Sequence, residues 1–333
     1  PYESLIKFNG PIFYFRYLFF ILGLKYLLNC NQPLLKYFTI SLLSVILFVS
    51  IDGYFQWYTG FNFFGFKSPS IRVTGVFNTE EILGHFLAHV TPLLIALLTY
   101  IFGIRKKRIF LYLLVLMIIE IMIFISNDRS AFLKIFQFTL LLILLSSNFK
   151  FLRLISFLIS SIIIISLISF APDSAERFQH TINDVSATTV PYMPWAPSHE
   201  THFAVAFDMF LKNPLFGQGP QLFKTLCLII PEYKNGCTSH PHNYYVQTLG
   251  ELGIIGVSFI FFFFIFIFIK LFRHFLSLWF FKSKNDLMPD YFVFLTSFIF
   301  ILLWPLIAHQ SFYNNWLNVM IFMSIGFYFY FLD

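Results

Sequence analysis

An uninterrupted apolar run, FIFFFFIFIFI at residues 259–269, most constrains what this chain can fold into. The run does not alternate between polar and apolar side chains, as a membrane β-strand would. Within lipid every backbone amide and carbonyl must be paired inside its own segment, so the run predicts a membrane-spanning helix. A span needs about 17–25 mostly apolar residues, and comparable stretches lie near 11–29, 38–57, 82–103, 109–126, 131–148, 153–171, 249–270, 290–309 and 316–332. The sequence therefore predicts an all-α fold, a polytopic transmembrane helical bundle of about nine spans.

The composition also excludes an ordinary soluble protein. Hydrophobic residues make up 58% of the chain and charged residues 11%, with 50 phenylalanines. Soluble proteins carry about 25% charged residues, so lipid must solvate much of this surface. The net charge of +6 is concentrated in short loops between apolar runs. This placement indicates membrane orientation rather than nucleic-acid binding.

Basic residues in short loops predict the orientation, because such loops stay on the cytoplasmic side. They follow the third, fifth and seventh apolar runs: Arg105–Arg108, Lys150 with Arg153, and Lys270–Lys284. We therefore expect the opposite face to hold residues 58–81, 127–130, 172–248 and 310–315. This orientation places the N-terminus outside. Together with Pro1 as the first residue, it predicts a chain that lacks upstream helices and its true N-terminus.

Two arginines lie at the outward membrane boundary, Arg72 in RVTGVFN and Arg129 in NDRSAF. A guanidinium group binds phosphate oxygens through a bidentate fork and keeps its charge. Both residues are therefore candidates for binding a lipid-linked phosphate. The alternative is an ordinary anchor to lipid headgroups.

The outward segment 172–248 is the longest hydrophilic stretch and carries five of the nine histidines. Its apolar spacing predicts a helix at about 202–212, ended by Asn213-Pro214 and followed by a glycine-rich turn. The segment ends in the motif H-P-H-N, where His240 and His242 can accept a proton near neutral pH. Asn243 either orients a ring or a sugar hydroxyl, or is the N-cap of the next helix.

Three further sets of polar residues have open roles. His85 and His89 have a metal-compatible spacing, but a pair of histidines facing water is the favoured interpretation, and no metal site is predicted. Glu120, near mid-membrane, is either functional or paired with an inward-facing partner. Cys227 and Cys237 lie outside the cytoplasm, which favours a disulfide over two free thiols.

Taken together, these segments resemble the O-antigen ligase/polymerase family. HNYYVQTLGELGIIG, beginning at His242, follows the family's H-N-x9-G-x2-G pattern, and FDMFLKNPLFGQGPQLF resembles its loop helix followed by G-x-G. The two arginine-bearing loops resemble those of the family as well, and the resemblance covers about 58–260. The chain departs at residues 199–202, where the family often has an arginine. It also departs at Asn78-Thr79, where the family has asparagine-proline.

The resemblance implies a GT-C-like fold in the bacterial inner membrane, with the active face in the periplasm. It implies metal-independent glycosyl transfer from an undecaprenyl-pyrophosphate-linked glycan donor to a saccharide acceptor, without cofactor or nucleic acid. His242 is then the base, Arg72 and Arg129 hold the diphosphate, and the implied substrate contacts are Asn243, His240, His202, Gly217 and Gly219. The acceptor is either a lipid-linked repeat or a lipid A core sugar. The cysteine-bearing C-T-S-H-P-H-N segment favours a polymerase over a ligase.

We expect three segments: N-terminal transmembrane helices at 1–57, an O-antigen ligase-related core at 58–270 and C-terminal transmembrane helices at 271–333. The main alternative function is a transporter or flippase of lipid-linked oligosaccharides. Such a protein should carry polar residues along a path through the membrane, whereas ionisable residues here gather at the outer ends, with Glu120 as the main exception. A structural membrane subunit would leave the histidine-rich segment unexplained.

Overall fold

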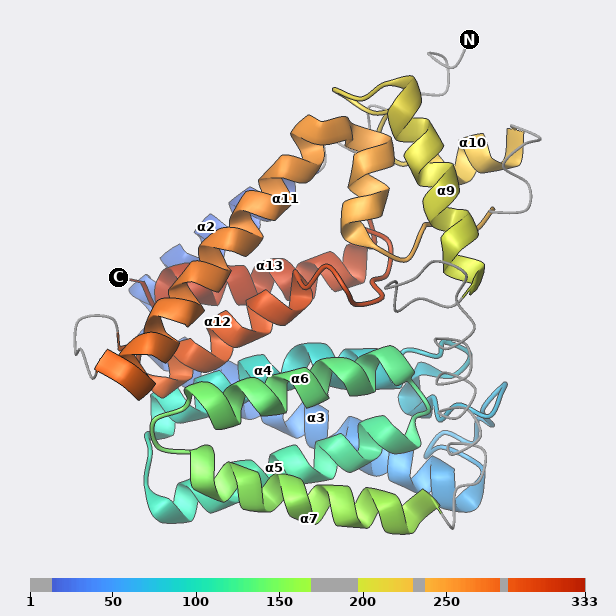
Figure 1. Cartoon of the computed structure of the whole chain (residues 1–333). Coiled ribbons are helices and arrows are strands. Elements are labelled where there is room, and N and C mark those ends of the chain that lie inside the picture. The colour runs from blue at the N-terminus through green and yellow to red at the C-terminus, as the bar shows by residue number, and fades with distance from the viewer. Residues whose placement is uncertain (1–13, 169–196, 230–236, 282–286, 333) are drawn as a thin grey trace. The chain divides into compact units, whose positions relative to one another are not determined.

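The computed structural model describes residues 14–168, 197–229, 237–281 and 287–332, and within these ranges the fold is all-α, without a β-strand (Figure 1). Among the described residues, each of the nine predicted spans overlaps a helix: α2 (Phe15–Cys30), α3 (Gln32–Thr59), α4 (Leu83–Phe102), α5 (Lys106–Ile125), α6 (Arg129–Leu145), α7 (Lys150–Ile168), α11 (Tyr244–Leu276), α12 (Asp290–Leu302) and α13 (Asn315–Tyr330). The predicted span at 290–309 was too long, because α12 ends at Leu302. Five of these, α3, α4, α5, α7 and α11, are long and apolar enough to cross a membrane. The chain is thus a multi-pass membrane protein, while the number of nine crossings stays a prediction.

Further helices in the described part of the chain are η2 (Gly75–Phe77), α9 (Pro197–Lys212), α10 (Phe223–Ile229) and η4 (Ser277–Phe281). The chain divides into two compact units, each assembled from separate stretches of sequence. The loop unit comprises Pro1–Leu22, Gln179–Ile267 and Leu303–Met323. The bundle unit comprises Gly23–Phe178, Phe268–Leu302 and Ser324–Asp333. The division into three consecutive segments stays a prediction.

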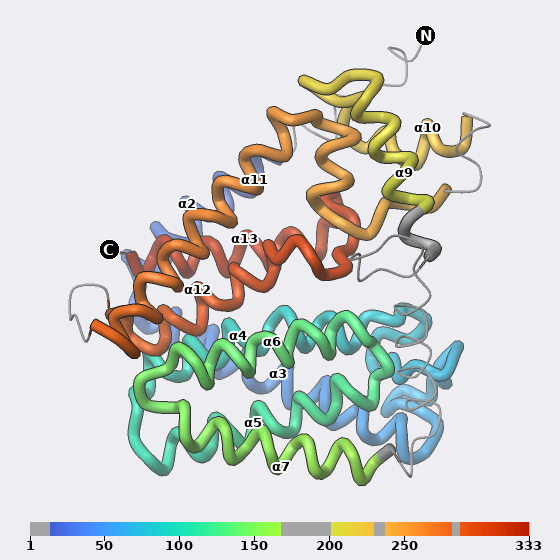
Figure 2. The backbone as a smooth tube through the Cα atoms, in the orientation of Figure 1, coloured from blue at the N-terminus to red at the C-terminus, as the bar shows by residue number. Residues whose placement is uncertain are grey.

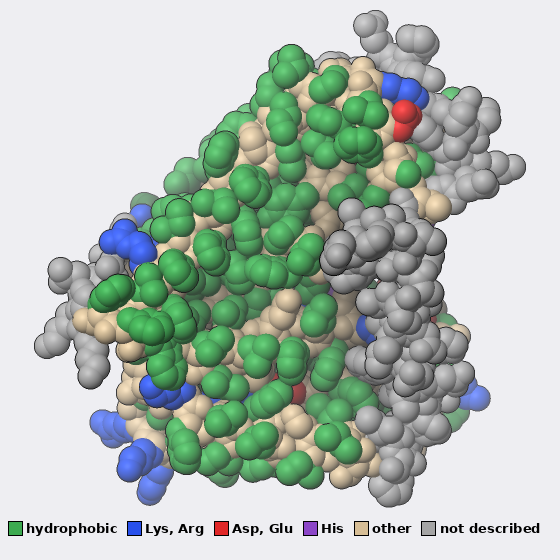
Figure 3. Space-filling view, viewed as in Figure 1, with side chains coloured by type: hydrophobic (Ala, Val, Ile, Leu, Met, Phe, Trp, Pro, Cys, Tyr) green, Lys and Arg blue, Asp and Glu red, His purple; other side chains and the backbone are tan. Residues whose placement is uncertain are grey.

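Helix α4 is the centre of the bundle unit, where it packs against α3, α5, α6 and α12 (Figure 2). Its side chains from Leu87 to Leu98 are buried on every side of the helix, as expected of a segment that is apolar apart from His89 and Thr91. Outer helices instead expose apolar side chains, for example Phe151 and Ile162 on α7. Figure 3 shows hydrophobic side chains over the visible face of α6 and α7. Such a surface is suited to lipid.

Basic segments gather at one end of the bundle unit, as the charge pattern predicted. The Lys150 ammonium, at the start of α7, lies 4.5 Å from the ring centroid of Trp279 beyond α11. Tyr100, near the end of α4, packs against Tyr291 of α12 with ring centroids 4.9 Å apart. At the other end, the Asn127 side chain donates a hydrogen bond of 3.0 Å to the Ile71 carbonyl. These contacts group the segments at two ends, and the assignment of one end to the periplasm stays a prediction.

Arg153 departs from the predicted pattern of loop cations. It lies in the first turn of α7, fully buried, and its guanidinium pairs with the Glu120 carboxylate of α5. The Thr139 hydroxyl on α6 contacts both groups. A buried charge is tolerated when an opposite charge and hydrogen bonds compensate for lost hydration. The structural pairing that was one alternative for Glu120 is therefore confirmed, and its partner is a residue that the sequence pattern had assigned to a loop.

Candidate functional site

Helix α11 breaks at Gly253, whose φ of 66° and ψ of −166° are not helical. Figure 1 shows the helix changing direction there. The turn that follows α9 fills the break through four backbone hydrogen bonds: Gln218 N–H to Gly250 O (3.0 Å), Gly219 N–H to Glu251 O (2.9 Å), Ile254 N–H to Pro214 O (2.9 Å) and Ile255 N–H to Leu215 O (3.4 Å). These bonds satisfy backbone groups that lose their partners where a helix is interrupted.

Glycines make this close approach possible. A Cβ atom on Gly217 would lie 2.3 Å from the carbonyl carbon of Glu251, and one on Gly253 would lie 2.4 Å from the carbonyl of Leu215. Both glycines also have positive φ, which favours glycine. The G-x-G and G-x2-G motifs thus have a packing role, in which the turn docks onto the broken helix. The substrate contact expected of Gly217 and Gly219 stays a prediction.

Three predicted site residues come together in the loop unit. His242 precedes α11 with a φ of 56°, in the left-handed region that few non-glycine residues adopt. Its carbonyl accepts a hydrogen bond of 2.8 Å from the His309 amide. The His242 ring centroid lies 4.2 Å from that of His240 and 6.0 Å from that of His202 on α9. We call these three residues, His202, His240 and His242, the histidine cluster. Segments about 40 residues apart in sequence thus build one group.

Asn243 is the N-cap of α11. Its side-chain oxygen accepts hydrogen bonds from the amides of Tyr245 (2.9 Å) and Val246 (3.1 Å). Its side-chain amide donates to the Pro305 carbonyl at 2.8 Å, so both ends of this buried group are occupied. The capping alternative is therefore confirmed. The cap holds the backbone of the preceding His242 against the segment that contains His309.

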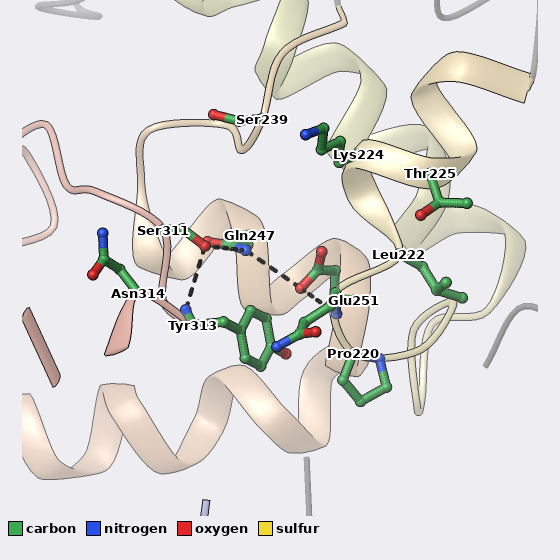
Figure 4. Close-up of a pocket in the computed structure, with 11 residues that line it drawn as sticks. Pro220, Leu222, Lys224, Thr225, Ser239, Gln247, Glu251, Ser311, Tyr313 and Asn314 are labelled. Atoms are coloured by element: carbon green, nitrogen blue, oxygen red, sulfur yellow. Dashed lines mark hydrogen bonds between the residues drawn. The ribbon is translucent and has the colours of Figure 1, made fainter. Parts of the chain in front are cut away.

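A pocket of about 360 Å³ opens beside the histidine cluster, wholly within the loop unit (Figure 4). Glu251 lies at its base, buried, and its carboxylate accepts hydrogen bonds from the amides of Gln221 (3.2 Å) and Phe223 (2.9 Å). The Tyr313 side chain lies against the same carboxylate, and burial together with this negative charge raises the pKa of the Tyr313 hydroxyl. Glu251 was not singled out from the sequence. Only its burial and its contacts in the folded chain mark it.

Cys227 and Cys237 form a disulfide in the structure, with Cα atoms 5.2 Å apart, as the sequence predicted. Cys227 is buried in a small hydrophobic core between α9 and α10, formed with Val205, Ala206, Met209, Leu222, Phe223 and Leu226. The bridge ties α10 to the chain that leads into the histidine cluster. Cys30, by contrast, is a free and exposed cysteine.

The two candidate arginines lie at one end of the bundle unit. Arg72 forms an ion pair of 3.0 Å with Glu81, and both side chains keep partial exposure. Arg129 is the first residue of α6, where the helix N-terminus favours anions. The hydrogen bond between Asn127 and Ile71 joins the two loops next to these arginines. The end of the bundle unit therefore offers two neighbouring cationic loops.

Asp128 organises the same end of the bundle unit. Its carboxylate accepts a hydrogen bond of 3.1 Å from the Ala131 amide as the N-cap of α6, and lies 3.4 Å from Nε2 of His85. Burial opposes ionisation, but His85, the Ala131 amide and Arg72 together hold the pKa of Asp128 below its usual value. Asp128 therefore carries a negative charge at neutral pH.

His85 and His89 do not form the water-facing pair that was favoured from the sequence. His89 is buried, with its Nδ1 atom 2.6 Å from the His85 carbonyl and its ring edge-on to Phe298 of α12. His85 points to Asp128 and Ser130 instead. Among the residues that the structure describes, no group of three or more histidine, cysteine, aspartate or glutamate side chains is arranged to hold a metal ion.

The predicted site residues thus fall into two sets. His242, His240, His202, Asn243 and the glycines belong to the loop unit, and Arg72 and Arg129 belong to the bundle unit. The family model described as O-antigen ligase matches residues 112–261. This range includes Arg129, the disulfide, the docked turn and the histidine cluster, whereas Arg72 precedes it. No curated protein matches the chain.

Proposed function

Residues 112–261 match the family model described as O-antigen ligase, and from this similarity we propose that the chain transfers a glycan from a lipid-linked donor to a saccharide acceptor. In this proposal the donor is an undecaprenyl-pyrophosphate-linked glycan and the reaction takes place on the periplasmic face of the inner membrane. The acceptor is a lipid-linked repeat, so that the protein acts as a polymerase, with a GT-C-like fold and no metal or cofactor.

The histidine cluster is the observation that carries the proposal. It lies where an apolar helix begins, which is where a lipid-linked sugar would meet the aqueous face, and the cap at Asn243 and the His309 amide hold its backbone. In the proposed step the acceptor hydroxyl oxygen forms a bond to the anomeric carbon. The bond from that carbon to the diphosphate breaks, and His242 takes the hydroxyl proton.

The departing diphosphate gains negative charge as its bond to the sugar breaks. Cationic groups placed where charge develops are an effective means of lowering such a barrier. Arg72 and Arg129 supply that charge in the proposal, because a guanidinium fork matches two phosphate oxygens at once. The Glu81 carboxylate paired with Arg72 would then exchange its place with a phosphate oxygen.

The test is glycan laddering in a deletion strain that carries the full-length gene. Loss of a general base costs about 10²–10⁴ in rate, so His242→Ala should abolish visible extension at unchanged protein level. Arg72→Lys and Arg129→Lys should also shorten the ladder, because an ammonium is a point charge. Arg105→Lys, in the basic segment at the opposite end of the bundle unit, is the control and should be silent. Normal ladders in His242→Ala would refute the role of this histidine.

A further inference from the structure

We infer that the pocket beside the histidine cluster binds a sugar residue of the saccharide acceptor. The site is built from three stretches of the loop unit: the start of α10, the first turns of α11 with Ser239 before them, and the loop that precedes α13 (Figure 4). Its volume of about 360 Å³ falls in the range of about 300–1,000 Å³ typical of small-molecule sites. The identification as an acceptor rests on the proposed function, whereas saccharide binding can be tested without it.

The lining has the mixed polarity that sugar hydroxyls need, since each hydroxyl both donates and accepts a hydrogen bond. The Gln247 amide lies 3.3 Å from the Ser311 hydroxyl, and Thr225 adds a second hydroxyl group to the wall. Lys224 contributes an ammonium at the exposed side of the pocket. The Tyr313 ring supplies an aromatic surface of the kind that packs against the apolar face of a sugar.

A diphosphate is a poor candidate for the same pocket. Glu251 places a buried acidic group at its base, where a diphosphate would need a cation or a free hydrogen-bond donor. Backbone amides are the groups that bind phosphate at a helix N-terminus, but here the amides of Gln221 and Phe223 already donate to Glu251. Lys224 is the one cation among the residues that line the pocket. The chemistry therefore favours an uncharged polar ligand such as a sugar.

Two contacts connect this pocket to the proposed base. Ser239 lines the pocket, and its hydroxyl oxygen lies 2.8 Å from Nδ1 of His240. The His240 ring centroid in turn lies 4.2 Å from that of His242. A sugar held in the pocket would thus have the histidine cluster at one side. This is the arrangement in which an acceptor hydroxyl can reach a base.

Binding of two oligosaccharides to the purified full-length protein tests the inference. The probes are the lipid-free repeat oligosaccharide and the lipid A core oligosaccharide, each released by mild acid from the surface glycan of the host. We expect saturable binding of one of them to the wild-type protein. Thr225→Trp fills the pocket and should weaken that binding by at least about tenfold, equivalent to about 1.4 kcal/mol. Leu228→Trp, on an exposed position of the same helix that does not line the pocket, should bind as wild type.

Because Thr225 is half-buried, Ser239→Phe at the exposed rim serves as a second blocking variant. Saturable binding that both blocking variants lose supports the inference, and the probe that binds distinguishes a polymerase from a ligase. If neither probe binds saturably, or if both blocking variants keep the wild-type affinity, the inference is overturned. His242→Ala should retain binding while its ladder is lost. If His242→Ala gives normal ladders while the blocking variants still lose saccharide binding, the proposed mechanism is refuted but the saccharide site is supported.

Discussion

The amide of Gly219 donates a hydrogen bond of 2.9 Å to the main-chain carbonyl of Glu251. Through this contact the turn after α9 is joined to the broken part of α11, and the side chain of the same glutamate caps the start of α10. One residue therefore connects the two glycine motifs to the base of the pocket.

Replacement of Gly217 by alanine should lower the thermal unfolding midpoint of the detergent-purified protein sharply. The new Cβ would lie 2.3 Å from backbone atoms of Glu251, which cannot rotate away. Gly65→Ala is the matched control, because Gly65 also has positive φ, +82°, but has nothing within 4 Å of the added atom. In the control, the free energy of unfolding should fall only by the cost of an alanine in the left-handed conformation, about 1–2 kcal/mol. Equal shifts in the two variants would mean that the docked turn does not support the fold.

Glu120→Ala should destabilise the bundle unit by about 3–5 kcal/mol, because it leaves the fully buried Arg153 without its counter-charge. Glu81→Ala removes a carboxylate from the partly exposed pair with Arg72 and should cost about 0–1 kcal/mol. Thermal unfolding in one detergent measures both. The double variant Glu120→Met/Arg153→Met should recover much of the loss. Similar midpoints for Glu120→Ala and Glu81→Ala would contradict the ion pair.

Joint replacement of Cys227 and Cys237 by serine should lower the stability of the loop unit by about 2–3 kcal/mol, because the bridge closes a short loop and so restricts the unfolded chain. Cys30→Ser, which removes an exposed free cysteine, should have little effect. Peptide mass spectrometry without reductant should detect the Cys227–Cys237 pair. Two alkylated thiols in freshly purified protein would argue against it.

Labelling of intact cells with a membrane-impermeant thiol reagent should show which positions of the chain face the outside of the membrane. In a Cys30→Ser background we expect reaction at Lys212→Cys, on the exposed surface of α9, and none at Lys106→Cys at the start of α5. The reason is that short loops rich in lysine and arginine resist translocation. Labelling at position 106 alone would invert the orientation and move the histidine cluster to the cytoplasm.

Local sequence was sufficient for most of the secondary structure. In the part of the chain that the structure describes, each apolar run overlaps a helix, because a backbone in lipid has few alternatives to a helix. Asn213-Pro214 ended α9 at Lys212 and Asn243 capped α11, since both effects act within a few residues. The cysteine pair was predicted from its expected location outside the cytoplasm, where a disulfide can form.

Contacts between distant residues decided the rest. Arg153 was expected in a loop, but a partner 33 positions away draws it into the bundle unit, where an isolated charge would be too costly. Glu251 has no local signal, because its neighbours in sequence do not reveal which backbone amides will need an acceptor. The glycine spacing was visible, yet the reason for it, a turn pressed against a broken helix, depends on segments some 35 residues apart. The local sequence pattern predicts the secondary structure that a segment prefers. Which charges and hydrogen-bonding groups become buried, and therefore need a partner, depends on which segments pack together in the folded chain.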